Sequence, residues 1–359
     1  MSPPSRKIVC FGEALIDMLA QPPASPEAPR NFLQYAGGAP ANVAVAAARL
    51  GADVHFAGML GEDMFGDFLF DSLASVGVST DCIVRTGEAK TALAFVALDE
   101  HGERSFSFYR PPAADLLFRA AHFTPACFEG TGVFHVCSNS LTGAEIADAT
   151  YEGMRRARAS GATVSIDLNL RPALWPQGED PTPRLWLALA EADLVKLSRE
   201  ELEYLARPLG GEEAVLQRLW QHRAQLLVVT DGAGPVVWHT RAASGTVETF
   251  QVTTLDTTAA GDAFVGGLLF HLTQHDRLGE GVAAFVSRHD DVAALQQAAK
   301  MVREGAIGLS AGLEYVPGRW STTDEVAALA KEIVPFDGVY IAHQRAEGGD
   351  QADAHIGVA

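Results

Sequence analysis

The chain has few basic residues. Its 359 residues include 27 lysines and arginines against 45 aspartates and glutamates, which gives a formal net charge of −18 at pH 7. A surface of this charge repels phosphate backbones and anionic lipid headgroups. We therefore expect neither a nucleic acid nor a membrane as partner, although a local pocket can still bind a small anion.

Cysteines are sparse too. The four present, Cys10, Cys82, Cys127 and Cys137, include no CxxC pair and have no histidine at zinc-finger spacing. Neither a disulfide framework nor a structural zinc site is indicated, and buried free thiols are the simpler interpretation. No run approaches the roughly 20 apolar residues that span a bilayer, and residues 1–7 lack the apolar core of a signal peptide. We expect a cytoplasmic protein.

Two common nucleotide-binding motifs are missing. The sequence contains no GxxxxGK[ST], and the glycine pair of Gly232 and Gly234 is followed by Pro235 instead of a helix with a third glycine. A P-loop and a Rossmann dinucleotide site are therefore disfavoured, which argues against a dinucleotide-dependent oxidoreductase.

The sequence does contain a regular alternation of short apolar segments and helical patterns. The apolar segments cover residues 7–10, 54–57, 132–137, 163–168, 193–197 and 226–230. The helical patterns cover residues 40–50, 65–76, 143–160, 199–206, 211–223, 260–273 and 292–309. This alternation predicts an α/β fold, in which a mainly parallel sheet is covered by helices on both faces.

Two regions depart from the alternation. Residues 91–98 and 104–110 are strand-like and are joined by a turn-rich segment, which predicts a hairpin outside the main sheet. We interpret this hairpin as part of a small lid. Residues 335–359 show no periodicity and are predicted to form a loosely docked or disordered tail.

The segment 256–267, with the sequence DTTAAGDAFVGG, carries the most informative pattern. The small residues Ala259, Ala260 and Gly261 lead into an apolar helix, so their backbone N–H groups can form an anion cradle at its amino terminus. Asp262 follows in the first turn, where it can accept a proton from a hydroxyl that attacks a bound phosphoryl group. Spacing alone leaves a second interpretation open, in which Asp262 only complements the helix dipole.

A second glycine-rich segment, residues 36–44 with the sequence AGGAPANVA, also ends a loop and opens a helix. Gly37 and Gly38 allow the backbone to approach a ligand closely, and the side chain of Asn42 offers a donor and an acceptor to a sugar hydroxyl. Taken alone this segment is a weak signal, because asparagine is a common helix cap.

Together, the two segments resemble the amino-terminal and carboxy-terminal patterns of the ribokinase-like (PfkB) carbohydrate kinases, and Gly51 and Gly61 extend the first pattern. The resemblance covers residues 7–332. It implies a ribokinase-like three-layer sandwich with a mainly parallel central sheet and a small β lid drawn from about residues 12–18, 31–36 and 91–110. It also favours the catalytic interpretation of Asp262 over the helix-dipole interpretation.

Within this family the chain is most similar to bacterial fructokinases. The similar phrases are FGEALID (11–17), YAGGAPAN (35–42), FYR (108–110) and DLNLRP (167–172). Ketodeoxygluconate kinases share a similar aromatic-arginine phrase, so a ketodeoxygluconate kinase and a ribokinase stay open as alternatives. A non-catalytic binding protein of the same fold is a further alternative, against which the presence of Asp262 argues.

The resemblance implies a role for each matching residue. Asp262 corresponds to the catalytic base, and Ala259, Ala260 and Gly261 correspond to the backbone anion hole; many relatives carry glycine where Ala259 stands. The residues implied on the sugar side are Asp17, Gly37, Gly38, Asn42 and Arg110. The residues implied near the nucleotide phosphates or ribose are Asn169, Arg171, Lys196, Thr230 and Gly232. For Asn169 and Arg171 a plain structural role, a loop salt bridge around Asp167, stays open.

The resemblance implies ATP as phosphoryl donor, Mg²⁺ as cofactor and a sugar as acceptor. The closer similarity to fructokinases implies that this sugar is D-fructose. It leaves activation by a monovalent cation open and implies a homodimer through the lid strands. The family often has an Asn-x-x-Glu phrase whose glutamate organises magnesium through water. Here Ser198 replaces the asparagine and Glu201 remains, so Glu201 either serves the metal or completes a helix capping box.

Overall fold

The computed structural model describes residues 6–21, 25, 29, 31–98, 104–110, 112–249, 259–279, 281–284, 308–311 and 339–342 of the chain. No helix in this part of the chain is long and apolar enough to cross a membrane.

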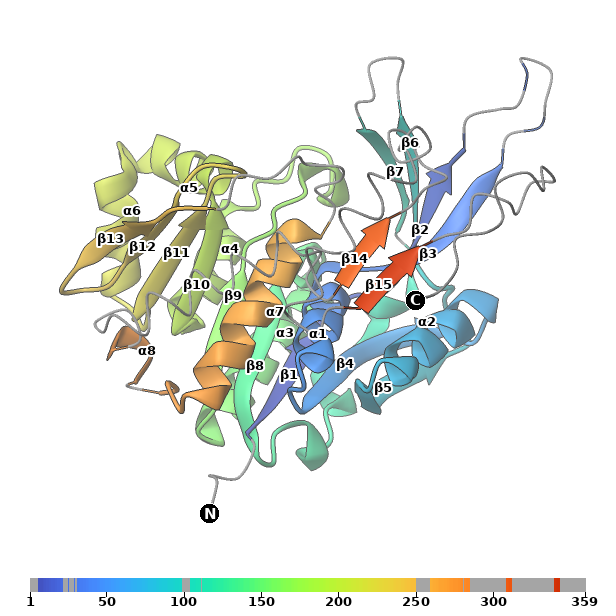
Figure 1. Cartoon of the computed structure of the whole chain (residues 1–359), viewed down its shortest axis with the longest axis horizontal. Helices are drawn as coiled ribbons and strands as arrows, with labels where there is room; N and C mark the ends of the chain where they lie inside the picture. The colour runs from blue at the N-terminus through green and yellow to red at the C-terminus, as the bar shows by residue number, and fades with distance from the viewer. Residues whose placement is uncertain are drawn as a thin grey trace.

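A nine-stranded sheet with the order β13-β12-β11-β10-β9-β8-β1-β4-β5 forms the centre of the fold (Figure 1). Its strands are β1 (Lys7–Phe11), β4 (Val54–Gly61), β5 (Ser79–Thr86), β8 (Thr131–Cys137), β9 (Thr163–Asp167), β10 (Leu194–Ser198), β11 (Leu226–Thr230), β12 (Val236–His239) and β13 (Ser244–Val247). All neighbours from β5 to β11 pair in parallel, and only β12 and β13 add antiparallel pairs at one edge. The predicted mainly parallel sheet is confirmed.

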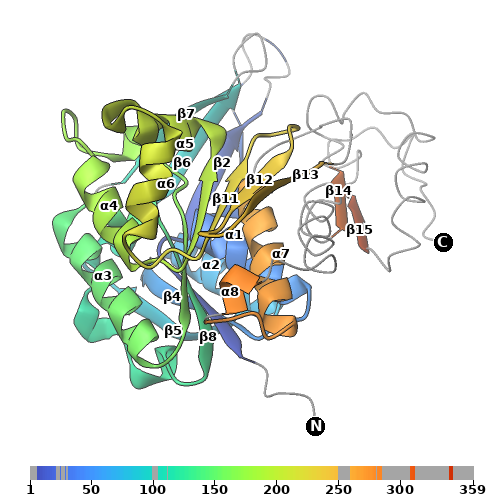
Figure 2. The same ribbon diagram turned by 90° about the vertical axis from the view of Figure 1, so that its left-hand side faces the viewer.

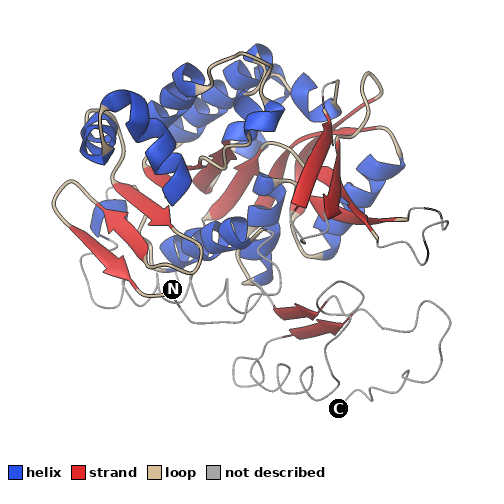
Figure 3. Ribbon diagram, turned by 90° about the horizontal axis from the view of Figure 1, so that it is seen from above, coloured by secondary structure: helices blue, strands red, loops and turns tan. Residues whose placement is uncertain are grey.

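Helices cover both faces of this sheet (Figures 2 and 3). One layer contains α1 (Ala39–Arg49), α2 (Met64–Ser75), α7 (Ala260–Gln274) and the short α8 (Gly281–Ala284); the other contains α3 (Ala144–Ala159), α4 (Thr182–Glu191), α5 (Arg199–Ala206) and α6 (Glu212–Trp220). Strand β1 shows why both faces are apolar. Ile8 and Cys10 pack in the core under α1 and α7, whereas Val9 and Phe11 pack in the core under α3. The fold is therefore the predicted three-layer sandwich.

A second, four-stranded sheet projects from the main body and forms the lid (Figure 1). Its strands, in the order β3-β2-β6-β7, are β2 (Leu15–Ala20), β3 (Phe32–Gly37), β6 (Leu93–Leu98) and β7 (Arg104–Tyr109). Strands β2 and β6 pair in parallel, and the other two pairs are antiparallel. The base of the sheet has a small core of its own, formed by Leu15, Ala92, Ala94 and Ala113.

Some elements were not predicted. They include α4, β5 and the hairpin of β12 and β13, which extends the sheet beyond β11. The helix predicted over 292–309 lies outside the described residues except at 308–309, which begin strand β14 (Gly308–Ala311) instead. This strand pairs in parallel with β15 (Val339–Ala342), inside the predicted tail. The other residues of 335–359 lie outside the described part.

Helices α1 and α7 lie side by side on the same face of the sheet (Figure 1), and a glycine allows their close approach. A Cβ atom added to Gly266 would lie 2.5 Å from the Cβ of Ala46 and 3.0 Å from the carbonyl oxygen of Val43. A side chain at position 266 would therefore push the two helices apart. Their contact matters because α1 carries Asn42 and α7 carries Asp262.

Candidate active site

Asp262 lies at the centre of the candidate site, in the first turn of α7, and is 7% exposed. The side-chain amide of Asn42, from the first turn of α1, donates to Oδ2 of Asp262 at 2.9 Å. The amide of Asn169, in the loop that follows β9, donates to Oδ1 at 3.1 Å. The structure thus brings together one predicted sugar-side residue and one predicted phosphate-side residue on the two oxygens of the predicted base.

Burial raises the pKa of Asp262 to about 7. The hydrogen bond from Asn42 lowers this pKa, the nearby charge of Asp167 raises it, and the positive charges of Lys196 and Arg171 lower it again. The carboxyl group therefore changes its protonation state close to neutral pH. A base of this strength is suited to accept the proton of an attacking hydroxyl.

The amino end of α7 offers backbone donors beside Asp262. Ala259 is the N-cap residue in a left-handed conformation, with φ of 58°, and its side chain makes no capping hydrogen bond. The first N–H groups of a helix have no partner inside the helix, and the helix dipole makes this end positive. Ala260 and Gly261 follow directly and are partly exposed. The geometry fits the predicted anion cradle.

A buried ion pair lies next to this cradle. The ammonium group of Lys196 on β10 is 3.0 Å from Oδ1 of Asp167 on β9, and a Cβ atom added to Gly261 would lie 3.2 Å from the same ammonium. Burial alone would lower the pKa of Lys196, but the negative charges of Asp167 and Glu201 outweigh it and raise the pKa. Lys196 therefore stays charged near the cradle. Arg171, which is exposed, adds a second positive charge within range of Asp262.

The predicted sugar-side residues meet where the lid joins α1. A Cβ atom added to Gly37 would lie 2.2 Å from Oδ2 of Asp17, so the carboxylate of Asp17 lies directly against the backbone of Gly37. Gly38 has φ of 107°, and a Cβ atom there would lie 2.5 Å from the carbonyl oxygen of Glu13. Gly38 is therefore required by its positive φ and its close backbone contact, whereas a side chain at Gly37 would collide with the side chain of Asp17.

Arg110 is buried at the base of the lid, and its role as a sugar contact stays a prediction. Its side chain is 2% exposed, and Nε donates to Oδ2 of Asp115 at 2.7 Å. Its Nη2 donates to the carbonyl oxygen of Asn139 at 3.0 Å. The guanidinium is thus held inside the protein at the base of the lid.

Glu201 completes the predicted capping box of α5. The backbone N–H of Glu201 donates to Oγ of Ser198, and Oε2 of Glu201 accepts from the N–H of Ser198 at 2.7 Å. Its Oε1 accepts from the N–H of Leu170, also at 2.7 Å. The capping role is confirmed, whereas a role in organising magnesium stays a prediction. In the described ranges no three His, Cys, Asp or Glu side chains gather into a metal site.

The two remaining predicted residues lie at the carboxyl end of β11. Thr230 is the last residue of this strand and pairs in register with Ser198 of β10. Gly232 follows in an exposed turn with φ of 50°. Ligands of open α/β sheets bind at the carboxyl ends of the strands, so both positions suit a nucleotide.

Two buried residues of this region, Glu13 and Asn139, were not predicted. Glu13, 1% exposed, follows the buried strand β1, and its Oε1 accepts from the N–H of Ala39 at 3.2 Å and from Nδ2 of Asn139 at 2.8 Å. The available signal was a carboxylate placed directly between a buried strand and a lid strand in the phrase FGEALID. Such a residue is rarely buried without a specific partner.

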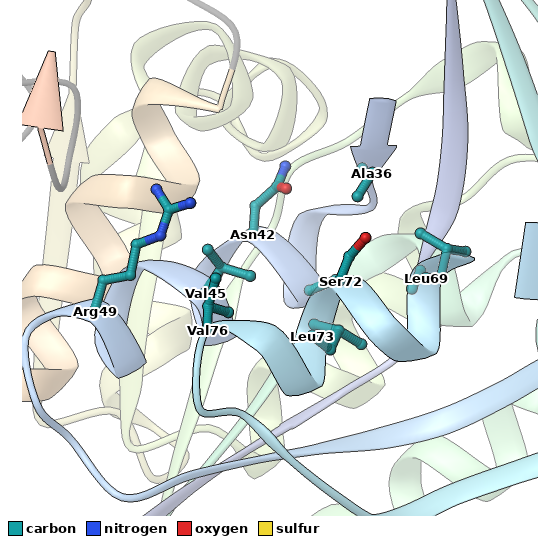
Figure 4. Close-up of a pocket in the computed structure, with 11 residues that line it drawn as sticks. Ala36, Asn42, Val45, Arg49, Leu69, Ser72, Leu73 and Val76 are labelled. Atoms are coloured by element: carbon teal, nitrogen blue, oxygen red, sulfur yellow. The ribbon is translucent and has the colours of Figure 1, made fainter. Parts of the chain in front are cut away.

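A cavity of about 170 Å³ lies beside the site, between α1 and α2 and against β3 (Figure 4). Asn42 and Gly37 contribute to its wall, but the rest is largely apolar and includes Val45, Leu73 and Val76. Sugar hydroxyls need polar partners. The largely apolar wall of this cavity is therefore not suited to a sugar.

Comparisons with known proteins identify the family of the chain. Residues 5–303 match the model of the pfkB family carbohydrate kinases. Fructokinase-1 from Oryza sativa subsp. japonica is 41% identical over 278 residues, which cover 75% of this chain and 84% of the relative.

Two solved structures have the same fold. A fructokinase from Xylella fastidiosa with bound ATP is 56% identical, with a TM-score of 0.81 over 91% of this chain and 99% of that one. A fructokinase from Vibrio cholerae O395, bound to fructose, ADP and calcium ion, is 32% identical, with a TM-score of 0.69 over 84% of this chain and 92% of that one. The family that the sequence motifs indicated is confirmed: the chain belongs to the pfkB family of carbohydrate kinases.

Proposed function

We propose that the protein is a fructokinase, which transfers the γ-phosphoryl group of ATP to the primary hydroxyl of D-fructose and forms fructose 6-phosphate. The observation that carries the proposal is the arrangement around Asp262. Its carboxylate is held by Asn42 on the sugar side and by Asn169 on the phosphate side, next to the open amino end of α7. The fructokinases from Xylella fastidiosa and Vibrio cholerae support the choice of ATP and of fructose.

In the proposed reaction Asp262 takes the proton of the sugar hydroxyl as the hydroxyl oxygen attacks the γ-phosphorus. The bond between that phosphorus and the bridging oxygen of ADP breaks, and ADP leaves. The N–H groups at Ala259, Ala260 and Gly261 and the dipole of α7 stabilise the negative charge on the transferring group. Phosphoryl transfer depends mainly on such positioning and charge stabilisation.

The sugar is assigned to Asp17, Gly37, Gly38 and Asn42, which meet at the junction of the lid and α1. The nucleotide is assigned to the carboxyl ends of β9, β10 and β11. Its proposed contacts are Asn169, Arg171, Lys196, Thr230 and Gly232. The lid, which stands over the sugar side, would exclude water and so limit hydrolysis of ATP.

The residues present fit a magnesium ion that is held mostly by nucleotide phosphates and water. Asp167 and Glu201 are both buried, and the charge of Asp167 raises the pKa of Glu201, in addition to the effect of burial. This local negative charge is only partly offset by Lys196, so Asp167 and Glu201 can hold the ion's water ligands. When bound, Mg²⁺ supplies positive charge at the transferring phosphoryl group.

A panel of sugars with ATP and Mg²⁺ in a coupled assay for ADP tests the proposal. Fructose should give the highest kcat/KM, well above ribose and 2-keto-3-deoxygluconate. A preference for 2-keto-3-deoxygluconate would assign the protein to the alternative acidic substrate, and a preference for ribose would make it a ribokinase. No turnover with any sugar would favour a non-catalytic binding protein of this fold.

We also propose a homodimer through the lid strands. Phe32, Leu33 and Tyr109 on these strands are 40%, 37% and 65% exposed, which is unusual for large apolar side chains on a small sheet. The ring of Phe95 links Phe32 and Tyr109, with centroid distances of 5.2 and 5.1 Å. Sedimentation of the wild type and of Tyr109→Ser should show a dimer that the substitution weakens.

A further inference from the structure

A buried polar cluster lies where the lid joins the main sheet. It consists of Glu13, Arg110, Asp115 and Asn139, which are only 1%, 6%, 4% and 5% exposed. The cluster joins the turn between β1 and β2, the end of β7 and the segment after β8. Burial of charged groups is costly unless they are paired, so such a cluster needs an explanation.

Glu13 supplies a helix cap from outside the helix. Gly38, the N-cap residue of α1, has no side chain that could accept from the first N–H groups. The carboxylate of Glu13 accepts from the N–H of Ala39 instead, at 3.2 Å. A negative charge at a helix amino terminus also interacts favourably with the helix dipole. The first turn of α1 is therefore held by a residue 26 positions earlier in the chain.

The same carboxylate is tied to the base of the lid. Oε1 of Glu13 also accepts from Nδ2 of Asn139, and the carbonyl oxygen of Asn139 accepts from Arg110. Burial raises the pKa of Glu13, whereas the positive charge of Arg110 lowers it. Arg110 in turn has a raised pKa, because the charges of Asp115 and Glu13 outweigh the effect of burial. Arg110 is thus engaged by protein groups on both sides.

This chain of contacts ends at the reacting groups. Asn42 lies in the first turn of α1, three residues beyond Ala39, and donates to Asp262. Gly38 lies so close to the backbone of Glu13 that an added Cβ atom would be 2.5 Å from the carbonyl oxygen of Glu13. A displacement of Glu13 would therefore move Gly38 and Asn42 together, but not the strand ends assigned to the nucleotide.

We propose that Glu13 is a positioning residue for the sugar: its carboxylate caps α1 from the turn after β1 and, with Arg110 and Asn139, fixes Gly38 and Asn42 against the base of the lid. Glu13 acts through the position of its oxygen atom at the N–H of Ala39, and Arg110 belongs to this support rather than to the sugar contacts. The inference rests on the proposed sugar kinase activity.

The test compares Glu13→Gln with Glu13→Asp. Glutamine keeps an acceptor oxygen at the N–H of Ala39 but removes the charge, whereas aspartate keeps the charge but withdraws the oxygen by one methylene. We expect Glu13→Asp to raise the KM for the preferred sugar by roughly ten- to a hundredfold, the usual effect of an unsatisfied buried donor. Glu13→Gln should restore the KM to within a fewfold of wild type, and both variants should keep the wild-type KM for ATP.

Asp193→Asn is the matched control, because Asp193 is also a largely buried carboxylate that accepts from a backbone N–H, that of Val164, at 2.9 Å, and lies near an arginine, Arg158. It lies before β10, at the opposite end of the sheet from the site. Its substitution should lower the unfolding midpoint without changing the sugar KM.

A higher sugar KM for Glu13→Gln than for Glu13→Asp would overturn the proposal. It would mean that the charge opposite Arg110 matters and the position of the oxygen atom does not. A parallel rise in the KM values for sugar and ATP would also overturn it, as a general loss of structure. An inactive wild type would instead contradict the proposed function, since the comparison of the variants requires a turnover to measure.

Discussion

The side-chain amide of Asn42 donates to the carboxylate of Asp262 over 2.9 Å, although 220 residues separate the two in the sequence. Asn169 donates to the other carboxylate oxygen. An amide side chain does not titrate, so these two partners fix the orientation of the carboxylate without competing for the proton it accepts.

Asp262→Asn should lower kcat by at least roughly 10²-fold, the usual scale for loss of a general base. The affinities for ATP and sugar should change little, because asparagine has nearly the same shape. Calorimetric titration and the coupled ADP assay measure the two effects. Asp276→Asn, just beyond the other end of α7, is the control and should keep wild-type turnover. If Asp262→Asn kept near wild-type turnover, Asp262 would not be the base and would only complement the dipole of α7.

Activity should fall in acid with a midpoint near the pKa of Asp262. This pKa is raised to about 7 by burial, and the base works only when deprotonated. The value of kcat/KM for the sugar should therefore rise with pH up to about 7 and level off above it. A pH series of kcat/KM measures the midpoint. A flat profile down to pH values near the ordinary pKa of an aspartate, about 3.9, would contradict the assignment.

Gly37→Ala should weaken sugar binding and leave ATP binding unchanged. The new methyl group would occupy the space of the Asp17 carboxylate, which lies 2.2 Å from the position of that Cβ. Displacing Asp17 should cost about 1–3 kcal/mol, or roughly ten- to a hundredfold in sugar affinity. Gly143→Ala is the control, since its Cβ would make only an ordinary 3.5 Å contact with Ile146. Unchanged sugar affinity in Gly37→Ala would remove Asp17 from the sugar site.

Ala259→Gly should stabilise the protein and retain activity. Ala259 has φ of 58°, in the left-handed region, which costs an L-residue with a side chain roughly 1–2 kcal/mol. Glycine avoids this cost but loses more chain entropy on folding, so we expect a net gain of about 0.5–1 kcal/mol in the free energy of unfolding. Chemical denaturation measures it. Ala263→Gly, inside the same helix, should have the opposite effect.

The lid should open more readily than the main sheet. The small core at its base contrasts with the fully buried strand interior of β11. Backbone amides of β6 and β7 should exchange hydrogen quickly in the free protein and more slowly with saturating fructose, because sugar contacts from Asp17 favour the closed arrangement. Amides of β11 should stay protected in both states. Equal protection of β6 and β7 with and without each sugar tested would show that the lid is a fixed part of the fold.

Local sequence patterns were sufficient to predict several helices and strands of the main sheet and its covering layers. Strand β11 was predicted with its observed ends, and α1, α5 and α7 were predicted to within one residue at each end, because their apolar periodicity and small-residue starts are continuous in the sequence. The hydrogen bond between Asn42 and Asp262 was not predicted, because the resemblance to a family implied only that both residues serve the same site.

The environment of Arg110 could not be read from the sequence. An arginine after two aromatic residues at the end of a strand is compatible with a ligand contact or with burial. The choice is made by Asp115 and Asn139, which approach from other elements. The capping of α1 by Glu13 could not be predicted for the same reason. It depends on a contact between the turn after β1 and the start of α1, which are distant in the sequence. Contacts between distant segments of this kind leave no local pattern.

The close approach of α1 and α7 at Gly266 limits which residues can be exchanged at this contact during evolution. Ala46 and Gly266 together set how closely α1 and α7 approach, and neither is among the residues assigned to sugar or nucleotide. A larger residue at either position would separate Asn42 from Asp262, so the two positions should vary as a correlated pair whose combined volume is limited. A combinatorial library over these two sites, selected for growth that requires the kinase, should yield only small-residue pairs.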